Sequence, residues 1–287
     1  MTDYNKLFNL HLEIFDNLTL QTIIAHDKEN YYVIKDISKI EYTNYLKVKN
    51  DKLPFLKPLK IAKHENHTYF LYNYYEYNYY ENHQSIYEAY DGILKTISLL
   101  HKKTAKKVPQ PKMAEIKYKK IALIANDRFN MLEMKIRNIE LNPVKNDLSW
   151  IYLSKYHIIL DIKLEIYKMI KRLKMIKDDV EVGINHGFPS QVHFFNNSFI
   201  SYKYLKEGVI ENDLYKVFLD FDSLEINHLE IIDKYLDEKY SKKYFKLMVL
   251  FSYLLMCDIE PNYTCASKYI KLTNKISRFM YQFKNYK

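Results

Sequence analysis

Two stretches near the middle of the chain hold residues that could do chemistry. The stretch 183–197 reads "GINHGFPSQVHFFNN", and the stretch 216–223 reads "KVFLDFDS". The first carries two of the four glycines of the chain, one of them directly after His186. The second is an apolar run that ends in two acids, Asp220 and Asp222. Histidine and carboxylate groups accept protons and bind metal ions, so these stretches are the first candidates for a functional site.

The first eighty residues are rich in β-branched and aromatic residues, and they predict a small β-rich lobe over 1–80. Strands are expected at 18–27 and 30–37, joined by the turn "DKEN". A short helix over 38–50 follows, and two further strands are expected within 56–77, around the turn "HENH".

The remaining residues, 81–287, predict a larger and mostly helical lobe. Apolar residues recur at three- and four-residue spacing over three long stretches, which favours amphipathic helices. These helices are expected at 85–104, 113–139 and 148–176. Short strands are expected only around the loop 183–197, at 191–195, 200–204 and 216–222. The predicted fold class is therefore α+β, with a β-rich N-terminal lobe and a helical C-terminal lobe.

The net charge of +9 allows a polyanionic partner, but the lysines are spread along the chain. Their densest groups, 101–107, 117–120 and 168–177, fall on predicted helices, so solvated helix faces are favoured over a nucleic-acid surface. A basic helical module that binds nucleic acid or another polyanion stays open as an alternative.

Cysteine use and hydropathy indicate the compartment. Cys257 and Cys265 have no metal-ligand spacing around them, which predicts reduced thiols in the cytoplasm. The first fifteen residues lack the basic and apolar regions of a signal peptide. The longest apolar stretch, 247–256, is too short to cross a bilayer. We therefore expect a cytoplasmic protein without a membrane span.

The order of these elements, with "INHG" followed by "FLDFD" in the large lobe, resembles the protein-kinase-like superfamily. The resemblance is to its aminoglycoside phosphotransferase and choline kinase branch. It implies a two-lobed kinase-like fold and ATP-dependent phosphoryl transfer, which relies on positioning and on charge neutralisation by Mg²⁺.

The resemblance also assigns residues. Lys35, in "YYVIKDI", matches the lysine on the third strand that holds the nucleotide phosphates, and Glu41 is the near candidate for its helical acid partner. Asp220 matches the acid that ligates Mg²⁺ at the end of the strand after the catalytic loop. Asp222 lies on the same face of such a strand and could substitute for it.

The catalytic loop departs from the pattern of the family. The family reads His-Gly-Asp, four residues and then Asn, whereas this chain has Phe188 in place of the aspartate and His193 in place of the asparagine. Phenylalanine cannot accept a proton, so no residue is assigned as catalytic. His186 is expected to be structural, held by backbone hydrogen bonds. The first glycine of the chain is Gly92, so no glycine-rich loop is available to cover phosphates.

A narrower resemblance lies in residues 126–173, which look like the helical insert of the spore-coat kinase-like proteins of the CotS and YutH type. YutH-type members also lack the catalytic aspartate. This resemblance implies a place in the spore coat and coat or scaffold proteins as partners.

The resemblance, together with the altered catalytic loop, implies a pseudokinase with a structural or binding role, with ATP and Mg²⁺ as its cofactors if nucleotide binding is retained. The alternative from the same fold is an active small-molecule kinase of the choline or aminoglycoside type. In that case Asp222, or an acid from the stretch Glu207 to Asp213, would take the place of the missing base. The small-molecule ligand is left unassigned.

Overall fold

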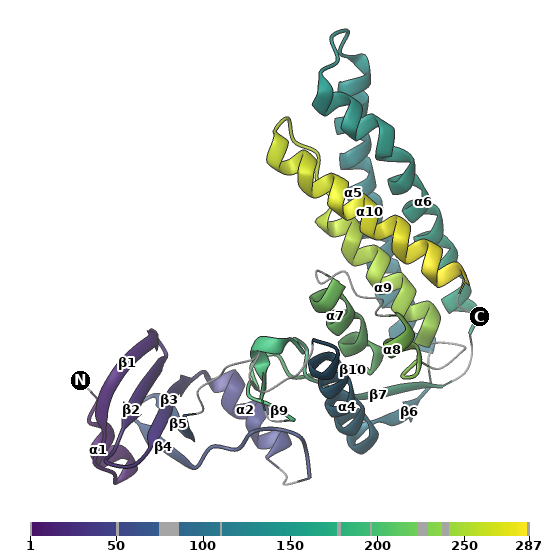
Figure 1. Cartoon of the computed structure of the whole chain (residues 1–287). Helices are drawn as coiled ribbons and strands as arrows, with labels where there is room; N and C mark the ends of the chain where they lie inside the picture. The colour runs from purple at the N-terminus through teal and green to yellow at the C-terminus, as the bar shows by residue number, and fades with distance from the viewer. Residues whose placement is uncertain are drawn as a thin grey trace. The chain divides into compact units, whose positions relative to one another are not determined.

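The computed structural model of the chain describes eight segments (Figure 1): 2–49, 52–74, 86–109, 111–176, 179–195, 197–222, 229–236 and 241–285. They form two compact units. The first unit joins 1–105 to 183–220, and the second joins 106–182 to 221–287. The predicted lobe boundary at residue 80 falls in 75–85, outside the described residues, so this boundary stays a prediction.

The N-terminal part of the first unit is a five-stranded antiparallel sheet in the order β1-β2-β3-β5-β4. Both predicted turns, "DKEN" between β2 and β3 and "HENH" between β4 and β5, are present. The prediction of one strand over 18–27 was wrong, because the chain turns at Leu20 and Gln21. That extra turn makes Lys35 a residue of the third strand. The strands are β1 (Glu13–Thr19), β2 (Thr22–His26), β3 (Tyr31–Ile37), β4 (Lys60–His64) and β5 (His67–Asn73).

Two helices accompany this sheet, α1 (Tyr4–Phe8) and α2 (Lys39–Val48). Helix α2 begins where the Ser38 hydroxyl accepts a hydrogen bond from the Glu41 amide, as an N-cap residue does. One core cluster lies between α1 and the sheet, and its buried members include Phe8, Ile34 and Leu71.

The rest of the first unit surrounds the loop 183–197. It consists of α4 (Ile86–Thr104), β7 (Val180–Asn185, which enters from the second unit), the 3-10 turn Gln191–His193, β8 (Phe194–Phe195), β9 (Ser198–Phe199), β10 (Lys206–Val209) and α7 (Glu211–Phe221). Helix α4 confirms the helix predicted at 85–104.

Three predicted strands in this region were wrong. Residues 191–195 form the 3-10 turn and only two strand residues, and residues 200–204 lie outside any strand. The stretch 216–222 continues helix α7, whose apolar residues Leu214, Val217, Phe218 and Phe221 are buried on one side. An apolar run of this length fits a strand or a buried helix equally well.

The second unit is a helical bundle (Figure 1). Helix α6 contacts α5, α9 and α10, and Ile159, Ile162 and Ile166 of α6 are fully buried. The helices predicted at 113–139 and 148–176 are confirmed as α5 and α6. Strand β6 was not predicted. The elements are β6 (Lys106–Val108), α5 (Pro111–Leu141), α6 (Asp147–Met175), α8 (Leu229–Asp233), α9 (Ser241–Met256) and α10 (Tyr263–Asn285).

Within the described segments, none of the helices combines the length and the apolar character that a membrane crossing requires.

Candidate functional site

Strand β3 and helix α2 bring Lys35 and Glu41 together. The Lys35 Nζ atom lies 2.6 Å from Glu41 Oε1. The Glu41 side chain is 5% exposed and that of Lys35 is 26% exposed, so the pair is shielded on the carboxylate side and open on the ammonium side. A partly buried ion pair of this kind holds the lysine in one place. The structure thus has the contact that the sequence analysis expected between these two residues.

The loop begins where β7 ends at Asn185, and its turn depends on Gly187. The φ angle of Gly187 is +83°, a conformation that L side chains rarely adopt. A Cβ atom at this position would lie 2.1 Å from the carbonyl oxygen of Tyr204. Only glycine fits between the loop and the segment that follows β9.

His186 is fully buried directly before this turn. Its Nε2 atom donates a hydrogen bond to the Ser201 carbonyl oxygen at 3.1 Å, and its ring stacks on Phe199 with 4.2 Å between centroids. Burial lowers the pKa of His186 to about 4, although Asp213 opposes this shift. The imidazole is therefore neutral at pH 7 and fixed in place, which is the geometry that a bracing role requires.

This buried imidazole makes stability depend on pH. The folded pKa of about 4 lies below the ordinary value of 6.5, so the unfolded chain takes up the proton first. We expect the free energy of unfolding to decrease as the pH falls from 6.5 towards 4. His186→Gln keeps an N–H donor but cannot titrate, so its decrease should be shallower. Histidine resonances followed by NMR should show a midpoint near 4 for His186, and a midpoint near 6.5 would contradict this expectation.

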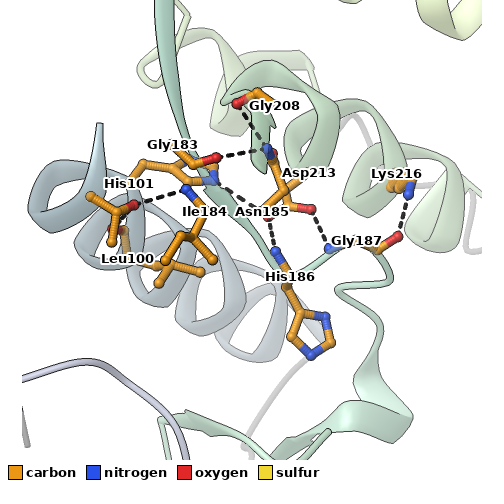
Figure 2. Close-up of polar contacts among 11 residues, drawn as sticks. Leu100, His101, Gly183, Ile184, Asn185, His186, Gly187, Gly208, Asp213 and Lys216 are labelled. Carbon is orange, nitrogen blue, oxygen red and sulfur yellow. Dashed lines mark hydrogen bonds and ion pairs between the residues drawn. The ribbon is translucent and has the colours of Figure 1, made fainter. Parts of the chain in front are cut away.

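Asp213 holds the loop from the opposite side (Figure 2). Its carboxylate accepts hydrogen bonds from the backbone amides of His186 at 2.7 Å and Gly187 at 2.9 Å. His101 of α4 places Nε2 3.3 Å from the same carboxylate. Burial would raise the pKa of Asp213, but the hydrogen bonds from His101 and the Gly187 amide outweigh it and lower the pKa. Asp213 is thus an ionised, fully buried acceptor for the loop backbone.

Two more side chains of α7 reach the loop. The Lys216 ammonium donates to the Gly187 carbonyl oxygen (Figure 2), and the Asp220 carboxylate accepts from the Gln191 amide at 3.4 Å. Asp213, Lys216 and Asp220 are spaced by three and four residues, so they share one side of the helix. We call these three residues the loop-holding face of α7.

Asp222 was expected to be able to substitute for Asp220 as the Mg²⁺ ligand, because both would lie on one face of a strand. Asp220 lies in helix α7 and Asp222 directly follows the end of that helix, so the two carboxylates do not share a face. Asp222 instead pairs with two cations of α10, Lys275 Nζ at 3.1 Å and Arg278 at 3.5 Å. Asp222 therefore does not take the place of Asp220 from the same face of one element. A metal-binding role for either carboxylate alone stays a prediction.

Aromatic rings occupy the position of the missing base. Phe188 is 48% exposed, and its ring centroid lies 5.4 Å from that of His193 and 5.6 Å from that of Tyr204. Burial lowers the pKa of His193, and the nearby Lys35 ammonium lowers it further. The surface after Gly187 is thus an aromatic cluster next to a cation.

Sequence reasoning did not single out His101 or Lys216, and it considered Asp213 only as one of several possible bases. The contact from His101 to Asp213 joins residues 112 positions apart, and the contact from Lys216 to Gly187 joins residues 29 positions apart. Once α7 is recognised as a helix, the spacing of its three polar residues is the signal that could have found them.

No protein-family model matches the sequence, and no curated protein matches it either. Solved structures do match. The aminoglycoside phosphotransferase from Alicyclobacillus acidocaldarius superposes with a TM-score of 0.64 at 9% sequence identity, over 95% of this chain and 91% of that one. The choline kinase LicA from Streptococcus pneumoniae superposes with a TM-score of 0.46 at 14% identity, over 94% of each chain, and this lower score adds nothing to the argument.

The chain therefore has the protein-kinase-like fold of the aminoglycoside phosphotransferase type, with a small antiparallel-sheet lobe and a helical lobe. This confirms the predicted fold class. At 9% identity the likeness establishes the fold and leaves the activity to be argued from the site.

Proposed function

We propose that this chain is a pseudokinase, a protein with a kinase fold that acts by binding and does not transfer phosphate. The observation that carries the proposal is Phe188. The residue that follows His186 and Gly187 presents a half-exposed aromatic ring, packed against His193 and Tyr204, where phosphoryl transfer needs a proton acceptor.

Two acids considered as replacements for the missing base, Asp213 and Asp222, are bound to other groups of the protein. Asp213 is fully buried and accepts hydrogen bonds from two loop amides. Asp222 is 5% exposed and paired with Lys275 and Arg278. Neither carboxylate can take a proton from a substrate hydroxyl without giving up contacts that hold the fold.

The ion pair between Lys35 and Glu41 supports a retained nucleotide site. It presents an ammonium group that is partly exposed and fixed by a buried carboxylate. Such a group can receive the phosphates of ATP by charge-assisted hydrogen bonds. We include retained nucleotide binding in the proposal on this ground.

For the partner we propose a coat or scaffold protein, with the spore coat as the location. Residues 126–173, which resemble the spore-coat insert, form the end of α5 and most of α6. This helical pair exposes large apolar side chains, among them Met134, Trp150 and Leu164. Side chains of this kind support binding to another protein. A fluorescent fusion that stays diffuse in sporulating cells would contradict the location.

The second candidate is an active small-molecule kinase, and one observation favours it. The Asp220 carboxylate contacts the loop at the Gln191 amide, and desolvation raises the pKa of Asp220 against the effect of that hydrogen bond. A carboxylate with a raised pKa next to the loop is a candidate general base.

A phosphotransfer assay separates the two candidates. With ATP, Mg²⁺ and either choline or an aminoglycoside, we expect no phosphorylated product from the wild-type protein, because Phe188 offers no proton acceptor. Phe188→Leu is the matched control and should give the same background. Product formed by the wild type and reduced about 100-fold or more in Asp220→Asn would establish the second candidate, since a general base contributes that much.

A further inference from the structure

The segment that carries the loop contains no carboxylate. Between Glu181 and Glu207 the sequence has neither aspartate nor glutamate, and its basic residues are two histidines and two lysines. Mg²⁺ prefers oxygen ligands and is usually held by one or two carboxylates together with the phosphates of the substrate. This segment supplies no such carboxylate.

The acids that the fold brings close to the segment already have other partners. Asp213 accepts from the His186 and Gly187 amides, and Asp220 accepts from the Gln191 amide. Glu41 is paired with Lys35. Among the described residues, this leaves no pair of carboxylates beside the segment that is placed to hold the magnesium ion of the kinase-like mechanism.

A lysine, Lys203, lies in the segment that follows the loop. The strand after the loop is β9, and the residues that follow Phe199 are Ile200, Ser201, Tyr202 and Lys203. The Lys203 ammonium lies 5.4 Å from the centroid of the Tyr204 ring. That ring lies 6.1 Å from the ring of His193. Lys203 thus belongs to the aromatic cluster around Phe188.

Lys35, on strand β3 of the sheet, contributes a second positive charge to the same cluster. After burial, the Lys35 and Lys203 ammonium groups are the cations that lower the pKa of His193, whereas Glu41 opposes them. The geometry agrees, because the Asn44 side chain of α2 donates a hydrogen bond to the Tyr202 carbonyl oxygen at 3.0 Å. The helix whose Glu41 holds Lys35 thus contacts the residue next to Lys203. Two ammonium groups that lie close together can bind an anion through their charge and their hydrogen bonds, without a metal ion.

We propose that this site binds the phosphates of a nucleoside triphosphate without a divalent metal ion, and that Lys35 and Lys203 supply the positive charge. The proposal rests on the retained nucleotide binding proposed above. Free nucleotide carries more negative charge than its magnesium complex, so it is the form that two lysines without a metal-binding acid attract more strongly.

The test is the change in melting temperature caused by ATP, measured on the full chain in excess EDTA and again in excess Mg²⁺. We expect the increase in EDTA to equal or exceed the increase in Mg²⁺. An increase that appears only with Mg²⁺ overturns this inference and leaves the pseudokinase proposal standing. If the melting temperature does not increase in either buffer, both metal-free binding and retained nucleotide binding are overturned. The absence of phosphate transfer is tested separately, by the phosphotransfer assay.

Two lysine variants locate the site. Lys203→Ala should raise the Kd for ATP in EDTA about tenfold. A loss of this size corresponds to one charge-assisted hydrogen bond. Lys206→Ala is the matched control, because Lys206 is also exposed and lies three residues further along. It should bind as the wild type does. Equal affinity in both variants would overturn the role of Lys203, and far-ultraviolet circular dichroism checks that each variant is folded.

Discussion

Asp213→Ala should lower the free energy of unfolding by about 3–5 kcal/mol, the range found when one member of a buried ionic network is removed. The substitution leaves the amides of His186 and Gly187 without their acceptor in a buried place. It also removes the carboxylate next to His101, which is 5% exposed. An unpaired buried donor costs about 1–3 kcal/mol, so several such losses together account for the range.

Urea denaturation of the full chain, followed by circular dichroism, measures this loss. Glu207→Ala is the matched control, because Glu207 is exposed on β10 and should change stability by less than about 0.5 kcal/mol. A loss below about 1 kcal/mol for Asp213→Ala would show that the loop does not depend on this carboxylate.

The same carboxylate has a pH signature. The pKa of Asp213 is lowered in the folded state, so its contribution is complete above the unfolded pKa of about 3.9 and is lost as the pH falls through the folded value. Asp213→Asn removes this titration, and its stability should change less than that of the wild type at the acid end.

Gly187→Ala should also be strongly destabilising, by about 2–4 kcal/mol. A non-glycine residue held at positive φ costs about 1–3 kcal/mol, and here the new Cβ would also meet the Tyr204 carbonyl oxygen at 2.1 Å. The loop would have to move away from the segment after β9. The melting temperature should fall accordingly, by about 2–4 °C for each kcal/mol in a chain of this size.

Gly92→Ala is a control that should change the melting temperature in the opposite direction. Gly92 lies inside α4, and a Cβ there would meet its nearest atom, on the ring of Phe194, at an ordinary 3.5 Å. Alanine in a helix interior is favoured over glycine by up to about 1 kcal/mol. We expect the melting temperature to rise in this variant. A similar change in both glycine variants would contradict the special role of Gly187.

Much of the fold could be predicted because its elements are long and regular. Apolar residues recur over many turns of helices α5 and α6, so a few residues that fit either a helix or a strand do not change the prediction of a helix. Two hairpins of the sheet, β2–β3 and β4–β5, were found from their turns, which use polar residues such as Asp27 and Asn30. The turn between β1 and β2 was missed. The short strands after the loop were misplaced, since two-residue strands such as β9 have no period to detect.

Helix α7 shows why the site was harder to predict than the fold. The run from Val217 to Asp222 is compatible with a strand that ends in two acids, and only the residues before it reveal the helical spacing. With that assignment Asp220 and Asp222 pointed to a metal, whereas the helix directs them to different partners. The pair of Lys35 and Glu41 was expected from the family resemblance, which calls for a helical acid partner, and Glu41 is the near candidate six residues further on.

The loop-holding face of α7 has a consequence for how this site can evolve. Each of its three side chains binds a backbone group of the loop, two amides through Asp213, one carbonyl through Lys216 and one amide through Asp220. Backbone groups are the same whichever side chain they carry. Selection for a stable loop therefore constrains the helix and Gly187, and leaves position 188 open to drift. A lineage could lose or regain a catalytic acid there by a single substitution while inheriting the scaffold unchanged.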